Sequence, residues 1–486
     1  MSTASPRSGL VVGVLAAAGI VVSLMQTLIV PLIADLPRLL NTSAANASWA
    51  ITATLLAGAV ATPVVGRLGD LYGKRRLLLI SALLLAAGSV VCAPADSLTP
   101  MVIGRALQGV GMGVIPLGIS IMRDVLPPQR LGSAMALMSS SLGVGGALGL
   151  PASALVAQHA DWHVLFWAAA VLGVLVAVAV FLVVPESPAG ATGRFDVVGA
   201  IGLSAGLVLL LLPVSKGGDW GWTSGTTLGM FAASAVVLLL WGWWELRTAS
   251  PLVDLRTSSR RQVLLTNLAS VVVGFAMYAM SLITPQLLQL PEATGYGLGQ
   301  SMVAAGLWMA PGGLVMMAVS PLAARLSAGR GPKISLFTGA VVIACGYVLA
   351  LGLSGSPWGI LFYSAVISAG IGFAYAAMPA LIMTAVPRSE TAAANGLNSL
   401  MRAIGTSTSS AVIGVVLANM TMKLGPVVLP SEEGFRTGFV IGGGVAVLAA
   451  LIVLLIPGRR AAATAGTASE IGSPRIEEPL PGSRAS

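Results

Sequence analysis

Long apolar runs separated by short polar turns make up most of this chain. Fourteen runs have about 18 or more mostly apolar residues, enough to cross a bilayer as a helix. Helices satisfy their own backbone hydrogen bonds in hydrocarbon, so the pattern predicts an all-α membrane protein. The expected spans are 10–34, 48–69, 77–95, 99–122, 132–157, 163–184, 197–214, 224–244, 262–287, 301–324, 334–353, 357–380, 393–417 and 435–457.

The spacing of the runs indicates two halves of six spans, separated by two further spans. Residues 125–134 align with 385–394, and both stretches follow a Gly-rich span, which suggests that the halves are duplicated. We therefore predict four parts. They are a six-helix bundle at 1–184, a linker with two additional helices at 185–261, a second bundle at 262–457, and a disordered cytoplasmic tail at 458–486.

Composition agrees with a membrane protein and excludes several other classes. Hydrophobic residues make up 56% of the chain, charged residues 9%, and the mean hydropathy is +0.92. The net charge of +9 comes from cations between the apolar runs, so it indicates topology rather than a nucleic-acid partner. Cys92 and Cys345 lie in or beside apolar runs, which supports neither a disulfide nor a metal site. The alternative of a membrane enzyme or receptor is disfavoured, because no cluster of acids, His or Cys lies inside the predicted spans and no long soluble domain is present.

The positions of the cations predict the orientation. Of the 26 Lys and Arg residues, four lie on one side (Arg38, Lys216, Lys423 and Arg436), two lie within spans, and the other 20 lie on the opposite side. Because loops rich in Lys and Arg stay in the cytoplasm, both termini are expected there.

One polar turn between two spans carries a recognisable pattern. Residues 66–76 read GRLGDLYGKRR, and a stretch so charged must lie in water. It resembles the loop signature of the major facilitator superfamily, which implies a gating role for Gly66, Asp70, Gly73, Lys74 and Arg75. Asp70 could oppose a helix N-terminus in one conformation and release it in another. An ordinary positive-inside loop is the alternative.

Two later spans resemble motifs of exporters in this superfamily. Arg105 and Gln108 share one helical face, in a motif associated in those exporters with proton coupling; a packing arginine bonded to carbonyls is the alternative. Gly145, Gly149 and Pro151 resemble the exporter signature of the fifth span, with the proline displaced by one position. We expect close packing of this span against the other half.

The first and the penultimate spans bear on substrate charge. In the sequence Leu24-Met25-Gln26-Thr27, Met25 stands where fourteen-span exporters typically have an aspartate. In the penultimate span, Asn398 and Arg402 resemble the pattern of those exporters, with a structural cap as the alternative. With two arginines and no acid inside the predicted spans, we expect a neutral, zwitterionic or anionic substrate, held by Arg105 and Arg402 with help from Gln26 and Gln108.

Aromatic and histidine residues add weaker candidates. Trp308, Tyr278, Tyr363 and Tyr375 could line an aromatic cavity, although packing against lipid or in the core is an equal alternative. His159 and His163 flank Asp161 at a spacing seen in metal sites. Without further ligands we favour a surface hairpin.

Apart from its tail, the whole chain resembles the fourteen-span drug:proton antiporter family. The resemblance implies alternating-access export of amphipathic drugs, antibiotics or metabolites, with proton antiport, by a monomer in a bacterial inner membrane. The implied partners are a small-molecule substrate, protons and membrane lipid, with no cofactor. Because Met25 replaces the acid, an exchanger, facilitator or importer without proton coupling, acting on a neutral or anionic solute, stays open.

Overall fold

The fold was analysed in a computed structural model that describes residues 6–32, 35–186, 193–425 and 427–457. Within these ranges, fourteen helices are long and apolar enough to cross a membrane, which is the number that the sequence predicted. The predicted tail at 458–486 lies outside the described residues. The all-α membrane architecture is therefore confirmed.

The first seven spans extend beyond the predicted runs at several ends. One predicted span, 99–122, is broken where Gly111–Gly113 form a tighter 3₁₀ turn, η2. The spans are α1 (Pro6–Thr27), α4 (Trp49–Tyr72), α5 (Lys74–Cys92), α6 (Leu98–Val110) with α7 (Val114–Val125), α8 (Pro128–His159), α9 (His163–Val183) and α10 (Val197–Trp220).

The second seven spans follow the same plan. They are α11 (Gly225–Arg247), α13 (Arg261–Gln289), α14 (Met302–Arg330), α15 (Pro332–Leu353), α16 (Pro357–Met383), α17 (Thr391–Asn419) and α18 (Glu432–Leu454). Short elements that the sequence analysis missed are η1 (Val30–Leu32), α2 (Leu36–Leu39), α3 (Ala44–Ala47), α12 (Leu255–Ser258), η3 (Glu292–Thr294), η4 (Arg388–Glu390), and the antiparallel strands β1 (Thr421–Leu424) and β2 (Val427–Pro430).

Buried apolar side chains form one large cluster in each half. The first runs from Val11 to Val184 and draws on α1 and α4 to α9, with two residues from the second half. The other runs from Ala269 to Ile456 within α13 to α18. Two separate cores support the proposed division into two bundles.

The halves meet crosswise along two helix pairs. On one side, α8 packs on α14: a Cβ at Gly313 would lie 2.2 Å from the carbonyl oxygen of Gly143, and one at Gly306 would lie 3.0 Å from the nitrogen of Pro151. On the other side, α4 packs on α17, where a Cβ at Gly396 would lie 2.8 Å from a carbonyl oxygen of α4. Each half therefore lends its second and fifth spans to the interface.

The expected packing of the fifth span holds for only part of its motif. Pro151 contacts the other half, as predicted. Gly145 and Gly149 instead face α1 in their own half, where a Cβ would lie 2.4 Å from the Ile20 carbonyl oxygen and 2.0 Å from the Thr27 hydroxyl. That part of the prediction was wrong, because these two glycines lie on the face of α8 opposite to its contact with α14.

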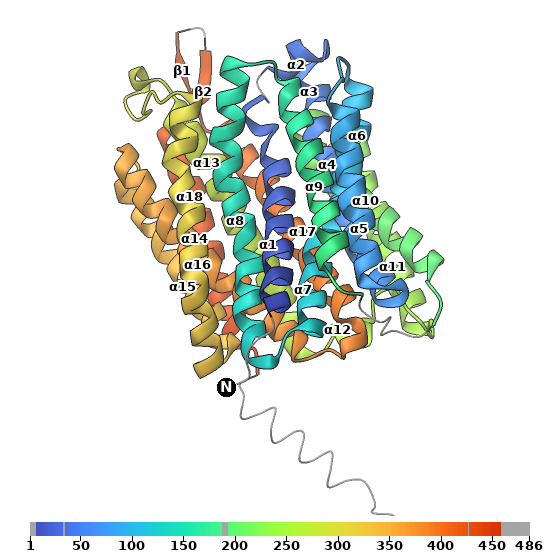
Figure 1. Cartoon of the computed structure of the whole chain (residues 1–486). Helices are drawn as coiled ribbons and strands as arrows, with labels where there is room; N and C mark the ends of the chain where they lie inside the picture. The colour runs from blue at the N-terminus through green and yellow to red at the C-terminus, as the bar shows by residue number, and fades with distance from the viewer. Residues whose placement is uncertain (1–5, 33–34, 187–192, 426, 458–486) are drawn as a thin grey trace, which may run out of the picture.

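The two additional helices lie outside one of these pairs. Helix α10 packs over α4 and α17, and α11 lies on the outer side of α10, at the right of Figure 1. Lys216, which we expected in an outer loop, instead lies in the last turns of α10, buried and bonded to Ser48 and Asp219.

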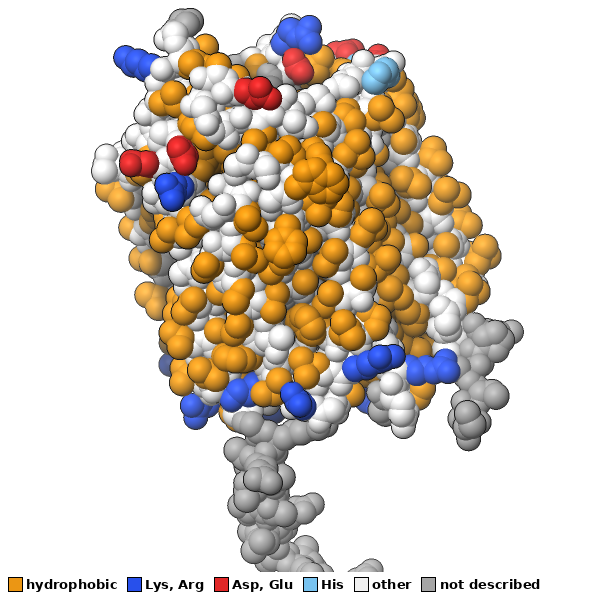
Figure 2. Space-filling model, turned by 90° about the vertical axis from the view of Figure 1, so that its left-hand side faces the viewer, with side chains coloured by type: hydrophobic (Ala, Val, Ile, Leu, Met, Phe, Trp, Pro, Cys, Tyr) orange, Lys and Arg blue, Asp and Glu red, His pale blue; other side chains and the backbone are white. Residues whose placement is uncertain are grey.

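Charged side chains gather at the two ends of the helices. On the face shown in Figure 2, a broad hydrophobic band separates Lys and Arg side chains below from a mixture of acidic and basic side chains above. We call the end that carries Lys74, Arg75 and Arg388 the basic end. Most of the helices are longer than the predicted spans or shifted along the chain, and α1 ends at Thr27 although its span was predicted to reach residue 34. The count of no acid within spans was therefore wrong at the helix ends, although each such acid lies within three residues of an end. These acids are Asp70, Asp124, Asp219, Glu245, Glu390, Glu432 and Glu433.

Candidate functional site

Asp70 joins the two halves at the basic end. It lies in the last turn of α4 and is fully buried. Its carboxylate accepts hydrogen bonds from the backbone N–H groups of Ala392, at 3.3 Å, and Ala393, at 2.9 Å. These are the unpaired donors of the first turn of α17, where a negative charge is also favoured by the helix dipole. Asp70 therefore caps a helix of the opposite half.

The rest of the predicted loop shapes this contact. Gly73 has φ +106°, a backbone conformation that favours glycine, and it lets α5 start directly after α4. A Cβ at Gly66 would lie 2.6 Å from the carbonyl oxygen of Ala392, so only glycine allows this approach. Lys74 lies 2.6 Å from Asp124 and 3.8 Å from Asp70, and so adds positive charge beside the capping carboxylate.

Arg75 serves its own half rather than this contact. It donates to Glu186 at 3.3 Å and to the carbonyl oxygen of Phe181 at 2.6 Å, and it stacks over the Phe181 ring. These contacts tie α5 to the end of α9. The gating role that the resemblance implied for Arg75 thus has no contact with the other half to support it among the described residues.

Arg123, which the sequence analysis did not single out, makes a second link across the halves. Its guanidinium donates to the carbonyl oxygens of Met383, at 2.7 Å, and Val386, at 3.2 Å, and to the hydroxyl of Thr391. A cation is favoured at the unpaired carbonyls that end a helix, here α16. The only sequence signal was a basic residue in the last turn of α7.

Arg105 is buried inside the first half, with 2% of its surface exposed. It donates to the carbonyl oxygens of Ala50 at 2.9 Å and Met25 at 3.0 Å, and to the Gln108 side chain at 2.8 Å. Gln108 in turn donates to Ser89 at 2.8 Å. The structure thus brings the two predicted residues together, in a network that ties α1, α4, α5 and α6.

The position of the missing acid lies beside this network. Met25 is buried, and its sulfur lies 3.9 Å from the Ser89 hydroxyl. Gln26 follows on α1 and is half-buried. An acid in place of Met25 would therefore lie near the Arg105 guanidinium, whose charge here is balanced by carbonyl and amide oxygens.

Arg402 lies in a polar cluster of the second half. Its guanidinium donates to Asn398 at 2.7 Å and to Ser399 at 2.8 Å, and lies 5.1 Å from the centre of the Tyr375 ring. Asn398 donates onward to Asn267 at 2.9 Å and to Ser270 at 2.6 Å on α13. Three predicted residues, Asn398, Arg402 and Tyr375, are thus brought together.

The other aromatic candidates make different contacts. Trp308 donates to Gln300 at 3.1 Å and packs edge-on against Trp358, which is 71% exposed. Tyr363 is fully buried against Phe439, and Tyr278 is half-buried on α13. Trp308 and Tyr363 therefore do not join the cluster around Arg402.

Helix α17 carries a polar stretch beyond Arg402 that the sequence analysis missed. Residues 405–410 read GTSTSS, and Ser410 lies about 12 Å further along the helix at about 1.5 Å per residue. There a cavity of about 440 Å³ is lined by α13, α17 and the β1–β2 hairpin, including Gln286, Ser410 and Leu429. The cavity thus lies beyond the cluster along α17, toward the hairpin and away from the basic end.

The two histidines do not form a metal site with Asp161. His159 bonds the carbonyl oxygen of Leu155, and hydrogen bonds from the backbone and side chain of His163 hold the pKa of Asp161 below its usual value. No group of three or more potential ligands occurs among the residues that the structure describes.

Comparison with known proteins identifies the class. The model of the Major Facilitator Superfamily matches residues 15–410, which is most of the chain. The protein therefore belongs to this superfamily, and its fourteen candidate spans indicate a multi-pass membrane protein.

Several bacterial relatives have multidrug or antibiotic names. An uncharacterized MFS-type transporter of Mycobacterium tuberculosis is 27% identical over 418 residues, covering 85% of this chain but only 59% of its own length. The multidrug resistance protein Stp of the same species is 27% identical, covering 79% of this chain and 71% of its own. A probable actinorhodin transporter of Streptomyces coelicolor is 29% identical, covering 76% and 65%.

Solved structures show the same fold. The human organic anion transporter MFSD10 superposes with a TM-score of 0.64 and 17% identity, covering 92% of this chain and 100% of that one. The proton:xylose symporter XylE also gives 0.64, with 15% identity and coverage of 93% and 96%. The fold predicted from the loop motif is thereby confirmed.

Proposed function

We propose that the protein exports amphipathic small molecules, such as drugs, antibiotics or metabolites, across a bacterial inner membrane by alternating access. The observation that carries this proposal is the contact of Asp70 with the first turn of α17. It joins the halves at one end through a few polar bonds, which can break and reform, whereas the glycine-lined pairs α8–α14 and α4–α17 allow rocking. Multidrug and antibiotic names among the relatives favour export.

The cluster around Arg402 is the substrate site that we favour. Arg402 is half-buried, and its guanidinium stacks on Tyr375 and is held by Asn398, so it can offer a positioned cation to a carboxylate or phenolate. The cavity at Ser410 would form the exit path toward the end opposite the basic end. On this proposal the basic end is cytoplasmic, and both termini lie on that side.

Coupling to protons is the finer part of the proposal. The family acid is replaced by Met25, and Arg105 is bonded to neutral groups. Proton antiport would therefore need a carboxylate outside this network, for which buried Asp70 is a candidate. The alternative is an exchanger, facilitator or importer without proton coupling, and the presence of Met25 in place of the family's acid favours it.

Transport by the purified protein in proteoliposomes tests these alternatives. An imposed pH gradient and a matched panel of anionic, neutral and cationic compounds would be applied. Accumulation that responds to the gradient supports antiport, whereas equal rates with and without it support the alternative. No movement of any amphipathic compound would contradict the proposal.

Replacing Met25 with Asp should introduce or increase dependence on the pH gradient. The new carboxylate would lie beside Ser89 and the Arg105 guanidinium in a buried site. There it can either take up a proton or stay charged and pair with Arg105, so its protonation would compete with the ion pair. We expect the ratio of rates with and without the gradient to rise several-fold. Met25→Asn is the matched uncharged control, and identical behaviour of the Asp and Asn variants would contradict the expectation.

Helices α10 and α11 should be peripheral to the substrate path. They pack outside α4 and α17, and only 11% of the α11 span is buried. Deleting residues 197–244 should lower the amount of folded protein but leave the order of preferred substrates unchanged, as measured by competition for transport. A changed order would show that these helices shape the site.

A further inference from the structure

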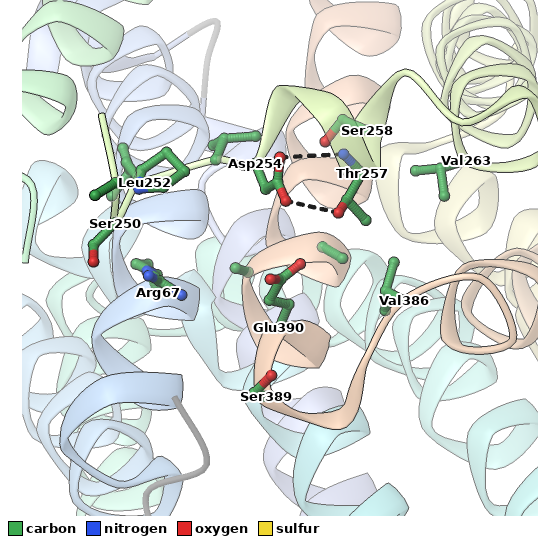
Figure 3. Close-up of a pocket in the computed structure, with 15 residues that line it drawn as sticks. Arg67, Ser250, Leu252, Asp254, Thr257, Ser258, Val263, Val386, Ser389 and Glu390 are labelled. Carbon is green, nitrogen blue, oxygen red and sulfur yellow. Dashed lines mark hydrogen bonds between the residues drawn. The ribbon is translucent and has the colours of Figure 1, made fainter. Parts of the chain in front are cut away.

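A cavity of about 240 Å³ lies at the basic end, where three parts of the chain meet. The first half contributes Arg67 from α4, the linker contributes residues 249–254 with Thr257 and Ser258, and the second half contributes Glu390, Ala393 and Ala394. Figure 3 shows Arg67 on one side of this space and Glu390 on the other. The cavity lies on the basic-end side of the Arg402 cluster: Ala394 precedes Asn398 by four residues on α17, about 6 Å along the helix, and Arg67 precedes Asp70 by three residues on α4.

Arg67 contributes a guanidinium with unmet hydrogen-bonding capacity. The residue is only 8% exposed, and its Nε has no hydrogen-bond partner among the described residues. A buried guanidinium N–H without an acceptor is costly, so Nε favours a hydrogen-bond acceptor such as a carboxylate in the cavity, in addition to the attraction between Arg67 and Glu390. It is not part of the loop signature that drew attention to Asp70.

Glu390 lines the same cavity and does not cap α17, because Asp70 caps that helix instead. It occupies the N-cap position of α17 but makes no capping hydrogen bond, since the first-turn N–H groups donate to Asp70. It is half-buried, attracted by Arg67 and Arg260 and repelled by Asp254. A positively charged group beside it would relieve that repulsion.

Asp254, the other carboxylate of the cavity, is already occupied. It accepts hydrogen bonds from the backbone of Arg256 and Thr257 and from the Thr257 hydroxyl, and so caps α12. Burial opposes its ionisation, but these hydrogen bonds outweigh burial and leave the pKa of Asp254 below its ordinary value. Asp254 therefore adds negative charge near Glu390 without needing a ligand.

We propose that this cavity binds a small zwitterion of the size of an aliphatic amino acid, with its carboxylate at Arg67 and its ammonium at Glu390. The volume equals that of about eight waters at about 30 Å³ each, which suits such a molecule. Apolar side chains complete the wall and would contact an aliphatic group: Leu252, Val253, Val263, Val386, Ala393 and Ala394. A carboxylate on a guanidinium also makes strong paired hydrogen bonds.

Occupation of the cavity would hold the basic end closed. The ligand would bridge α4 and α17 beside the Asp70 contact, so it binds the closed state in preference to one in which these helices separate. The zwitterion thus acts as an inhibitor from the cytoplasmic side. This effect rests on the proposed function, whereas the binding itself does not.

Binding to the purified full-length protein tests the site directly. L-leucine is compared by calorimetry and thermal unfolding with 4-methylpentanoate, which lacks the ammonium, and 3-methylbutylamine, which lacks the carboxylate. We expect saturable binding of leucine, at least tenfold tighter than either analogue. Arg67→Gln and Glu390→Gln should each weaken leucine binding at least tenfold, whereas Arg388→Gln, a nearby exposed cation that does not line the cavity, should not.

Several results would overturn the assignment. No binding of leucine by the wild-type protein, or equal binding of leucine and both analogues, would exclude a zwitterion site even if the variants failed to fold. Leucine binding that survives Arg67→Gln but is lost in Arg402→Gln would place the ligand in the transport site instead. Failure of transport by the protein would leave these binding results unaffected, so the two proposals can fail separately.

Discussion

Replacing Asp70 with Asn should lower transport at least fivefold while leaving the protein inserted in the membrane. The amide keeps the size of the side chain but loses the charge that favours the first turn of α17, and its NH₂ group cannot accept a hydrogen bond from Ala392 or Ala393. A loss of about 1–2 kcal/mol is expected for a buried charge at a helix N-terminus. That loss shifts the balance of the two access states by about 5- to 30-fold.

Transport rates and cysteine accessibility at the basic end, measured on the same vesicles, check this expectation. The variant should show slower transport and greater labelling of the seam between α4 and α17. Asp35→Asn is a suitable control, because Asp35 makes only an exposed pair with Arg38 at 3.6 Å. Gly66→Ala should act in the same direction, because its methyl group would collide with the Ala392 carbonyl oxygen. Wild-type rates in Asp70→Asn would refute the gating role.

Replacing Arg402 with Gln should reduce export of anionic substrates more than that of neutral ones. Glutamine can keep a bond to Asn398 but loses the charge and the stacking on Tyr375. A hydrogen bond to a charged group contributes about 1.5–3 kcal/mol, so anion export should fall more than about tenfold. Arg402→Lys keeps the charge without the planar group and should retain part of the activity.

Arg105→Gln provides a contrast within the same experiment. Arg105 is bonded to two backbone carbonyls and Gln108 inside the first half, so its loss should lower the amount of folded protein. Total transport should then fall by the same factor for every substrate. Resistance assays and direct transport separate these effects from substrate preference. Robust export of quaternary cations, unchanged in both variants, would rule out the expected preference for neutral, zwitterionic or anionic substrates.

The fold could be predicted from the sequence because the bilayer leaves few alternatives. Apolar runs of sufficient length must form helices, and the cations between them set the orientation. The stretch from Gly66 to Lys74 stood out because its charges cannot enter hydrocarbon. The predicted aqueous turn was wrong in detail: residues 66–72 belong to α4, only Gly73 separates α4 from α5, and Asp70 and Lys74 are buried between helices rather than in water. The ends of the helices were less accurate, because the turns beyond a run, such as that of Lys216, are stabilised by specific partners rather than by hydropathy.

The contacts within the site were harder to predict, because they join residues far apart in the sequence. Arg105 and Arg402 look alike as cations in apolar spans, yet one is enclosed by carbonyl oxygens and the other is half-buried beside Tyr375. Arg123 gave only the weak signal of a basic residue in the last turn of a helix, because its partners are carbonyl oxygens at the end of α16, which no sequence pattern marks. Asn267 and Ser270 became part of the site only through the packing of α13 on α17.

Because of the position of α10, the two contacts between the halves, α4 with α17 and α8 with α14, differ in their exposure to lipid. The seam of α4 and α17 is covered by α10, whereas that of α8 and α14 has no such cover among the described helices, and a hollow of about 460 Å³ lined by Val12, Leu137 and Met317 lies beside it. When the halves rock, acyl chains must rearrange mainly along the bare seam. Bilayer composition would then act on the conformational balance from one flank of the protein, even though the sequence predicts that the two halves are duplicated.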